Sequence, residues 1–285
     1  MDVAQGQSAA DVARSLKSQG VIRSPLFFRV LCKLTRWDRD IKPGVYLLRR
    51  RMSSFEALWR LTHTPSQFVK IVVPEGFSAR QIAQRLEAHG VASGQEFLEH
   101  IRAKSLEGYL LPTTYYFSRG MRGPQVADHM NREFRRAVEP EFRKSHRGML
   151  SPEQVVILAS IVEREAVKPE EKPLIAAVYL NRLARRQPLE ADPTVQYALG
   201  YWKKNVNHED LKTASSYNTY MRYGLPPGPI CSPGLGSIRA VLSPARTGAL
   251  YFVADNTGGH TFSLTFEEHL KAKERAKRGR RPRAR

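Results

Sequence analysis

The chain has 285 residues, and its 41% hydrophobic content is enough for a folded protein of one large or two modest domains. Its formal net charge of +19 is typical of proteins that contact anionic polymers or anionic surfaces. The longest apolar run, Val155–Val162, is interrupted by Ser160 and is far shorter than the roughly 20 residues of a membrane-spanning helix. Met1–Gly20 lacks the apolar stretch of a signal peptide, and Cys32 and Cys231 stand in no metal-binding or redox motif, so no metal and no cofactor is predicted.

The first half of the chain contains one short module twice. Gly6–Val21 (GQSAADVARSLKSQGV) aligns without a gap on Gly76–Val91 (GFSARQIAQRLEAHGV). In each copy a serine can cap a helix, apolar residues follow at helical spacing, and a glycine ends the helix. Alternating apolar residues predict strands at Phe68–Val73 and Gly44–Leu48, and by symmetry Val3–Gln5 should end a strand. The chain then starts at an element, so we expect an upstream segment to be missing.

The second half is predicted to combine helices with long loops. Helices are expected at Ser151–Ala166, where Ser151 is the N-cap and proline follows, and at Glu171–Arg185. Loops rich in Pro and Gly fill Gln187–Gly236, and ordered loops of this length often carry function.

Two glutamates end the apolar helix, and helical geometry turns them apart. Glu163 shares a face with Val156, whereas Glu165 shares a face with Leu158, so the two cannot form the close carboxylate pair, roughly 5 Å apart, of a retaining glycosidase. A carboxyl buried there without a cation would have a raised pKa and could donate a proton. A salt bridge to Arg164 or Arg182 is the alternative, and helical geometry leaves both open.

The last segment, Lys271–Arg285, is strongly basic. Nine Lys or Arg residues against Glu274 give it a charge of +8, and no apolar side chain in it is larger than alanine. We therefore expect a disordered tail that either stays solvated or contacts anionic lipid or polymer. RNA binding would favour interleaved aromatic residues, and the tail has none.

Seven stretches resemble, in order and spacing, the motifs of the YceG-like endolytic murein transglycosylases. The resemblance covers about Val3 to Leu270. The stretches are LASIVEREA at Leu158–Ala166, LEGYLLPTTYYF at Leu106–Phe117, VYLNRL at Val178–Leu183, LEADPTVQYALG at Leu189–Gly200, SSYNTY at Ser215–Tyr220, GLPPGPICSPG at Gly224–Gly234 and YFVADNTGGHTFS at Tyr251–Ser263.

The resemblance implies an α+β protein with a LysM-like module at 1–66, a catalytic domain at 67–270 that contains the second module copy at 68–91, and the basic tail at 271–285. It implies lytic cleavage of the β-1,4 bond between N-acetylmuramic acid and N-acetylglucosamine in nascent peptidoglycan, with 1,6-anhydro ends that terminate the strand. The family normally carries an N-terminal membrane helix, so we expect the inner membrane, with the catalytic part in the periplasm and the anchor absent from this chain. The expected partners are glycan strands, peptidoglycan synthases and an anionic membrane surface, and no nucleic acid.

The family's catalytic glutamate matches Glu163, which would protonate the glycosidic oxygen and then take a proton from the sugar's C6 hydroxyl. One acid suffices because the substrate supplies the nucleophile. The expected substrate-binding side chains, which offer amides, phenols and an imidazole, are Asn181, Gln196, Tyr217, Asn218, Tyr220 and His260.

Several of these residues have an alternative interpretation. His260 could equally be a core histidine, Asp192 before proline could cap a turn, and Glu107 is a rival acid that more often would be structural. Thr113, Leu111 and Leu270 depart from the family's usual aspartate, aromatic and asparagine.

Two other functions remain as alternatives for the whole chain. One is a non-catalytic peptidoglycan-binding module, and the other, less favoured, is a basic nucleic-acid binder.

Overall fold

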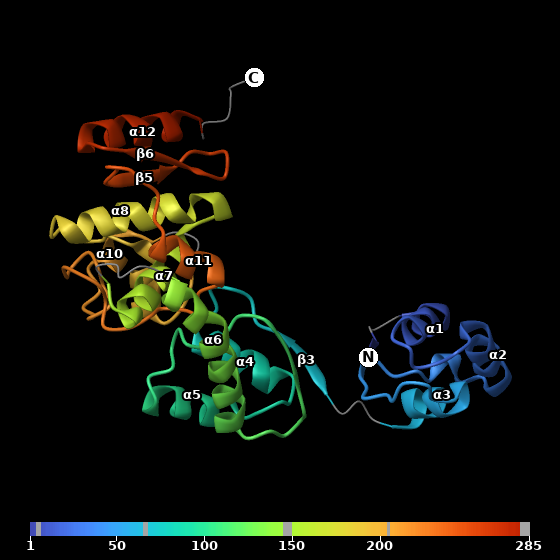
Figure 1. Cartoon of the computed structure of the whole chain (residues 1–285). Coiled ribbons are helices and arrows are strands. Elements are labelled where there is room, and N and C mark those ends of the chain that lie inside the picture. The colour runs from blue at the N-terminus through green and yellow to red at the C-terminus, as the bar shows by residue number, and fades with distance from the viewer. Residues whose placement is uncertain (4–6, 65–67, 145–149, 204–205, 280–285) are drawn as a thin grey trace. The chain divides into compact units, whose positions relative to one another are not determined.

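The computed structural model describes residues 1–3, 7–64, 68–144, 150–203 and 206–279 (Figure 1). Helices dominate, and the described strands pair into two-stranded antiparallel sheets, so the expected α+β class is confirmed. Among the described residues no helix combines the length and apolar character needed to cross a bilayer. The contacts divide the chain into two compact units, the first made of Met1–Val72, Ala83–Phe97 and Thr114–Val126, and the second of Val73–Ile82, Leu98–Thr113 and Ala127–Arg285.

The first unit begins with three helices around a small core. These are α1 (Ala9–Ser18), α2 (Pro25–Thr35) and α3 (Ser54–His63), with the 3₁₀ turn η1 (Trp37–Arg39) after α2. A serine hydroxyl caps the N-terminus of each α-helix, which satisfies one of its free amides. The core includes Val12, Leu16, Phe28, Leu58 and Leu61. Two short strands, β1 (Asp2–Val3) and β2 (Gly44–Val45), pair beside these helices.

The predicted repeat is confirmed in the backbone of its two helices, α1 and α4 (Ala79–Ala88). Val21 N donates to Leu16 O at 2.9 Å in the first copy, and Val91 N donates to Leu86 O at 2.9 Å in the second. The glycine before each valine has a positive φ, 71° and 64°, which glycine adopts without strain.

The strands predicted in this half are present but shorter. β3 (Val69–Val72) pairs with β4 (Thr114–Phe117), and only Gly44–Val45 of the expected Gly44–Leu48 strand is paired. Of the expected Val3–Gln5 strand end, Val3 lies in β1 and the other two residues lie outside the described residues.

Two further helices, α5 (Gly94–Ala103) and α6 (Gly123–Lys144), follow the repeat and, like α4, contribute residues to both units. Pro140 lies inside α6.

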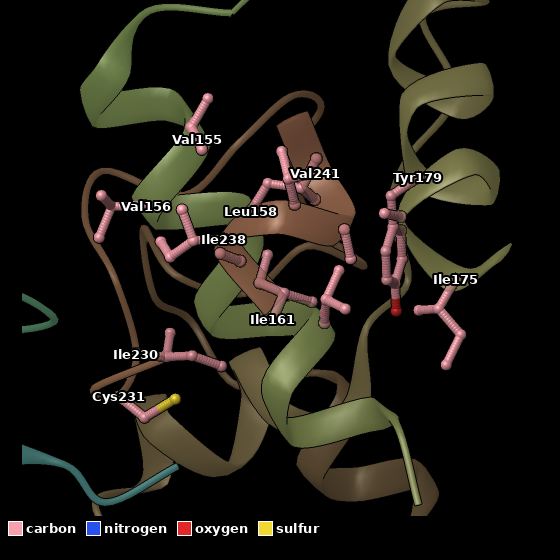
Figure 2. Close-up of a cluster of buried hydrophobic side chains, with 14 of the residues drawn as sticks. Val155, Val156, Leu158, Ile161, Ile175, Tyr179, Ile230, Cys231, Ile238 and Val241 are labelled. Carbon is pink, nitrogen blue, oxygen red and sulfur yellow. The ribbon is translucent and has the colours of Figure 1, made fainter. Parts of the chain in front are cut away.

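The second unit is built around α7 (Pro152–Glu165). The helices α8 (Lys172–Ala184) and α11 (Leu235–Leu242) pack against it, and their apolar side chains interdigitate with those of α7 in one core (Figure 2). A 3₁₀ turn, η2 (Pro169–Glu171), leads into α8, so the predicted helix starts one residue later than expected. Two short helices, α9 (Asp192–Leu199) and α10 (His208–Leu211), interrupt the region predicted as loop.

The chain then forms a hairpin of β5 (Tyr251–Ala254) and β6 (His260–Ser263), which lies between α8 and α12 (Phe266–Gly279) in Figure 1. The expected disorder from Lys271 onward is therefore wrong for Lys271–Gly279, which is helical, while 280–285 lie outside the described residues. Two features offset the repulsion among the Lys and Arg side chains of α12. Glu267 forms an ion pair with Lys271 one turn away, and Ala272 is buried.

Candidate active site

Local interactions set the start and the burial of α7, whose last turn carries Glu163. Its N-terminus carries a capping box, in which Ser151 Oγ accepts from Gln154 N at 3.3 Å and Gln154 Oε1 accepts from Ser151 N at 2.9 Å. The helix interior is buried, including Ser160, whose hydroxyl donates to Ile157 O at 2.7 Å and accepts from Ile230 N at 3.0 Å. That serine therefore ties the Pro-rich segment to α7, and the next turn brings Glu163 to the end of the packed region.

Four hydrogen bonds hold the Glu163 carboxyl group. Lys172 Nζ, at the start of α8, lies 3.1 Å from both oxygens. Oε2 also accepts from Gly234 N at 3.0 Å and from Ser237 Oγ at 2.6 Å. Only 8% of the Glu163 side chain and 10% of the Lys172 side chain are exposed, so the predicted arginine partners are replaced by a nearly buried lysine.

The N-terminus of α11 contributes to this arrangement. Gly234 is the N-cap of α11 and Ser237 lies in its first turn, so one amide and one hydroxyl at the start of this helix donate to the carboxyl group. A helix N-terminus carries a partial positive charge that favours an anion there. Glu163 is therefore oriented by three elements of the second unit, α7, α8 and α11.

A second carboxylate shares the same lysine. Glu75 Oε2 lies 3.6 Å from Lys172 Nζ, and half of the Glu75 side chain, 51%, is exposed. Gly234 leaves the room for it, because a Cβ added at Gly234 would lie 1.8 Å from Glu75 Oε1. The Lys172 ammonium thus bridges a buried glutamate and one that reaches solvent.

Arg164, the residue after Glu163, faces the indole of Trp202. Its guanidinium carbon lies 3.8 Å from the ring centroid, which is the geometry of a cation–π contact. Arg164 Nε is buried and has no hydrogen-bond partner among the described residues.

A cavity of about 570 Å³ lies in the second unit, and Trp202 is one of the residues that line it. Glu107 lines it, with Oε1 accepting from Ala79 N at 2.9 Å and Oε2 accepting from Tyr197 OH at 3.3 Å. Burial raises the pKa of Glu107 to about 7, because these hydrogen bonds only partly offset the loss of hydration.

Glu165 points away from Glu163, as the helical geometry predicts. Its Oε1 accepts a hydrogen bond from Tyr179 OH at 2.8 Å, and burial raises the pKa of this carboxyl group to about 7. The two glutamates therefore do not act as a pair.

Two of the predicted substrate-binding residues lie together. Gln196 and Tyr217 both line the cavity that contains Glu107, and the ring of Tyr217 lies 4.8 Å, centroid to centroid, from that of Tyr197. Gln196 Oε1 accepts from Lys203 N at 3.0 Å, which leaves its amide nitrogen for a ligand.

The other four predicted residues use their polar atoms within the protein. Asn181 Nδ2 donates to Thr247 O and Ala249 O, and the fully buried Asn218 donates to Leu211 O and Thr213 O. These two asparagines therefore fix loops.

Tyr220 OH donates to Asp192 Oδ1 at 2.6 Å, and Asp192 is the first residue of α9. His260 Nδ1 lies 2.6 Å from Glu171 Oε2, and only 8% of the His260 side chain is exposed. The substrate-binding roles of all six residues stay predictions.

Lys172, Ser237, Glu75 and Trp202 were not among the predicted site residues. Lys172 follows Glu163 by nine positions and lies within a run of charged residues, which sequence alone reads as solvated surface. Ser237 and Glu75 are distant in sequence and meet Glu163 or its lysine only through the fold. No group of three His, Cys, Asp or Glu side chains in the described part of the chain has the geometry of a metal site.

Comparison with known proteins gives one consistent result. A sequence 30% identical over 302 residues, covering 96% of this chain and 84% of the relative, is the "Endolytic murein transglycosylase" of Bacillus subtilis (strain 168). The protein of that name from Streptococcus pneumoniae serotype 2 is 28% identical over 93% of this chain, which spans 56% of that longer relative. A crystal structure titled as a putative yceG-like protein, lmo1499 from Listeria monocytogenes, superposes with a TM-score of 0.63 at 30% identity, covering 95% of this chain and 97% of that one.

The family model described as the YceG-like family matches residues 1–275, which include the first unit, all but the last ten residues of the second, and every residue of the site described above. Together with the relative that is 30% identical over most of both chains, this match shows that the chain belongs to the YceG-like family.

Proposed function

We propose that the chain is an endolytic murein transglycosylase that cuts the β-1,4 bond between N-acetylmuramic acid and N-acetylglucosamine and leaves 1,6-anhydromuramic ends. The observation that carries the proposal is Glu163, a carboxyl group at the end of a buried helix, held by Lys172, Gly234 and Ser237. Relatives that bear this activity in their names match nearly the whole chain, which supports the same assignment.

One carboxyl group can carry out the whole reaction. The bond between the anomeric carbon and the leaving oxygen breaks, the leaving oxygen receives a proton from Glu163, and the C6 hydroxyl of the same muramic acid bonds to the anomeric carbon. The carboxylate then takes the proton of that hydroxyl, so Glu163 ends in its starting state and no water is consumed. Hydrogen bonds from Ser237 and Gly234 hold the carboxylate form between the two proton transfers.

The contacts of Lys172 suit the carboxylate form of Glu163. An ammonium 3.1 Å from both oxygens stabilises negative charge on them, and its second partner Glu75 keeps it in place from the solvent side. We propose that Lys172 and Ser237 are positioning residues that aim Glu163 at the glycosidic bond.

We further propose that the glycan lies across the cavity lined by Gln196 and Tyr217, whose amide and ring suit an N-acetylated sugar. Asn181, Asn218, Tyr220 and His260 would then border the bound strand from positions that their hydrogen bonds hold in place.

The front module at 1–66 is proposed to be LysM-like and to hold the glycan for the catalytic domain at 67–270. Its repeated strand–helix motif, with matching helix ends in the two copies, supports a binding role. Peptidoglycan synthases are the proposed partners, because a strand-terminating enzyme must act where strands are made.

The proposed place of action is the periplasmic face of the inner membrane. Support comes from α2, where Leu26, Phe27, Val30 and Leu34 are all exposed. At about 100° per residue these side chains share one side of the helix, beside the exposed Arg29 and Lys33. Residues 1–64 hold twelve Lys or Arg against five Asp or Glu, so an apolar helix face flanked by positive charge suits an anionic lipid surface.

The experiment is a digest of uncrosslinked glycan strands, with the products identified by mass spectrometry. The wild-type chain should yield ends lighter than reducing muramic acid by one water molecule, and Glu163→Gln should yield none. Glu209→Gln, which alters an exposed glutamate paired with Lys212, is the matched control and should cut normally. Hydrated reducing ends would make the protein a hydrolase, and no cleavage by the wild type would favour a peptidoglycan-binding module.

A further inference from the structure

The cavity of about 570 Å³ has a mixed lining that suits a sugar ring. Four aromatic side chains, Tyr197, Tyr201, Trp202 and Tyr217, supply flat apolar surfaces of the kind that pack on the faces of pyranose rings. Between them Glu107 and Gln196 supply polar atoms that can contact hydroxyl or acetamido groups.

Glu107 is held in place within this lining. The amide of Ala79 donates to Oε1 at 2.9 Å, while Oε2 accepts from the hydroxyl of Tyr197 at the longer distance of 3.3 Å, and the backbone of Gly108 adds a further hydrogen bond to the carboxyl group. Its neighbour Gly108 has a φ of 80°, and a Cβ there would lie 2.3 Å from Pro229 Cβ, so the Pro-rich loop locks the backbone beside the carboxyl group.

The cavity is linked to the segment that carries Glu163 through one side chain. Trp202 lines the cavity, and its ring contacts the guanidinium of Arg164, the residue that follows Glu163. The pKa of Cys231 is raised first by burial and then by the charges of both Glu163 and Glu107, so both carboxyl groups lie within electrostatic range of this thiol.

We propose that the cavity is the subsite for an N-acetylated sugar beside the bond that Glu163 cuts, with the Glu107 carboxyl group contacting the acetamido group of that sugar. The proposal rests on the proposed function and adds a residue and a ligand group to it.

The protonation state of Glu107 decides how it can contact the sugar. Because burial raises its pKa to about 7, Glu107 carries a proton in mildly acidic solution and can donate it from Oε2 to the acetamido oxygen. Above that pKa the carboxylate can only accept, so it repels the acetamido oxygen. Binding should therefore be strong below pH 7 and weaken as pH rises through the pKa.

Other charged or titratable groups face Glu107 and set this behaviour. Arg80 lowers its pKa through space, while Tyr197 OH hydrogen-bonds to it and Tyr217 and Cys231 lie in electrostatic range. The pKa values of both tyrosines and of the thiol are raised, so these groups remain neutral through the titration of Glu107. Arg102 is a further basic residue in the lining of the cavity.

The test is calorimetric binding of an N-acetylglucosamine tetramer to the full chain carrying Glu163→Gln, which prevents turnover. Kd should be about tenfold higher at about pH 8.5 than at about pH 5.5, the worth of one hydrogen bond to a neutral acid. Near pH 7 binding should take up protons, which buffers of different ionisation enthalpy reveal without a further substitution. A glucose tetramer, which lacks acetamido groups, should bind weakly at both pH values.

Adding Glu107→Gln, whose amide donates at any pH, should keep the low-pH affinity and remove both the pH dependence and the proton uptake. Adding Glu209→Gln, an exposed position, should change neither. Three outcomes would overturn the proposal. The chain with Glu107 intact could bind the tetramer equally well at both pH values, or not at all, or the pH dependence could survive Glu107→Gln.

The two proposals fail separately. Anhydro ends in the digest together with pH-independent binding would remove the role of Glu107 and leave the transglycosylase. Hydrated ends together with pH-dependent tetramer binding would remove the transglycosylase and leave the subsite.

Discussion

Three glutamates in the second unit have different environments, and these suit different roles. Glu163 is ion-paired with Lys172 and hydrogen-bonded at the start of α11. Glu107 opens into a cavity with a pKa raised to about 7 by burial, and Glu165 is buried with a similar pKa and a single tyrosine partner. Glu165 is enclosed by the protein, whereas Glu107 lines a cavity in which it can carry a proton, and Glu163 is held at a fixed position by three donor residues.

Replacing Lys172 tests the ion pair. Lys172→Met leaves a nearly buried carboxylate without its cation, which should lower the free energy of unfolding by about 3 kcal/mol and kcat by roughly tenfold or more. The double variant Lys172→Met/Glu163→Gln should recover most of the stability, because no buried charge is then unpaired. Lys212→Met breaks an exposed pair with Glu209 and should cost almost nothing. Urea unfolding with glycan kinetics measures both effects, and equal stability of the two single variants would contradict the prediction.

Glu165 should make stability depend on pH. Its pKa is about 7 in the folded chain against a model value of 4.5, so between these values the folded chain keeps a proton that the unfolded chain has lost. Stability therefore falls as pH rises through this window, by on the order of 3 kcal/mol for this one group.

Glu165→Gln, which can still accept from Tyr179, should remove that part of the slope. Glu107 contributes a pH dependence of the same sign, which this substitution does not touch. The total change in the free energy of unfolding between about pH 4.5 and about pH 7 should therefore drop to roughly half. Unfolding in urea at several pH values measures this, and an unchanged slope in Glu165→Gln would show that Glu165 ionises normally.

At the scale of elements, the sequence predicted what local chemistry decides. Ser151 and Pro152 set the start of α7, and the helical period separated Glu163 from Glu165, as observed. Strand lengths and the loop helices α9 and α10 were missed because tertiary packing determines them. The donors to Glu163 were missed for the same reason, since Ser237 lies 74 positions away along the chain.

The turn at Gly108 connects the Glu107 segment to the Pro-rich loop. Gly108→Ala would place a side chain at a φ of 80° and 2.3 Å from Pro229 Cβ, so it should destabilise the chain by about 2 to 4 kcal/mol. Gly224→Ala has a similar φ of 82° but nothing within 4 Å, so it isolates the backbone cost, about 1 kcal/mol. Equal losses in the two variants, measured by urea unfolding, would mean that the loop yields and does not hold Glu107.

At the scale of the whole molecule, the net charge of +19 and the exposed apolar face of α2 should both contribute to binding at a membrane surface. Basic residues attract the chain to anionic lipid over about a Debye length, but that attraction weakens with salt. Apolar side chains that enter the interface add a contribution that salt does not screen. Binding to anionic vesicles should therefore fall with salt to a plateau that depends on α2.

Leu26→Ser/Leu34→Ser should lower this high-salt plateau roughly tenfold, since each leucine loses a part of its burial energy of about 2 kcal/mol. Met221→Ser/Leu264→Ser removes two exposed apolar side chains from the second unit and should leave the plateau unchanged. Sedimentation with vesicles of anionic and of uncharged lipid measures the binding of the wild type and of both double variants. If the α2 double variant binds as the wild type does, or if the wild type prefers uncharged lipid, then α2 does not contact the membrane and the basic charge serves the glycan instead.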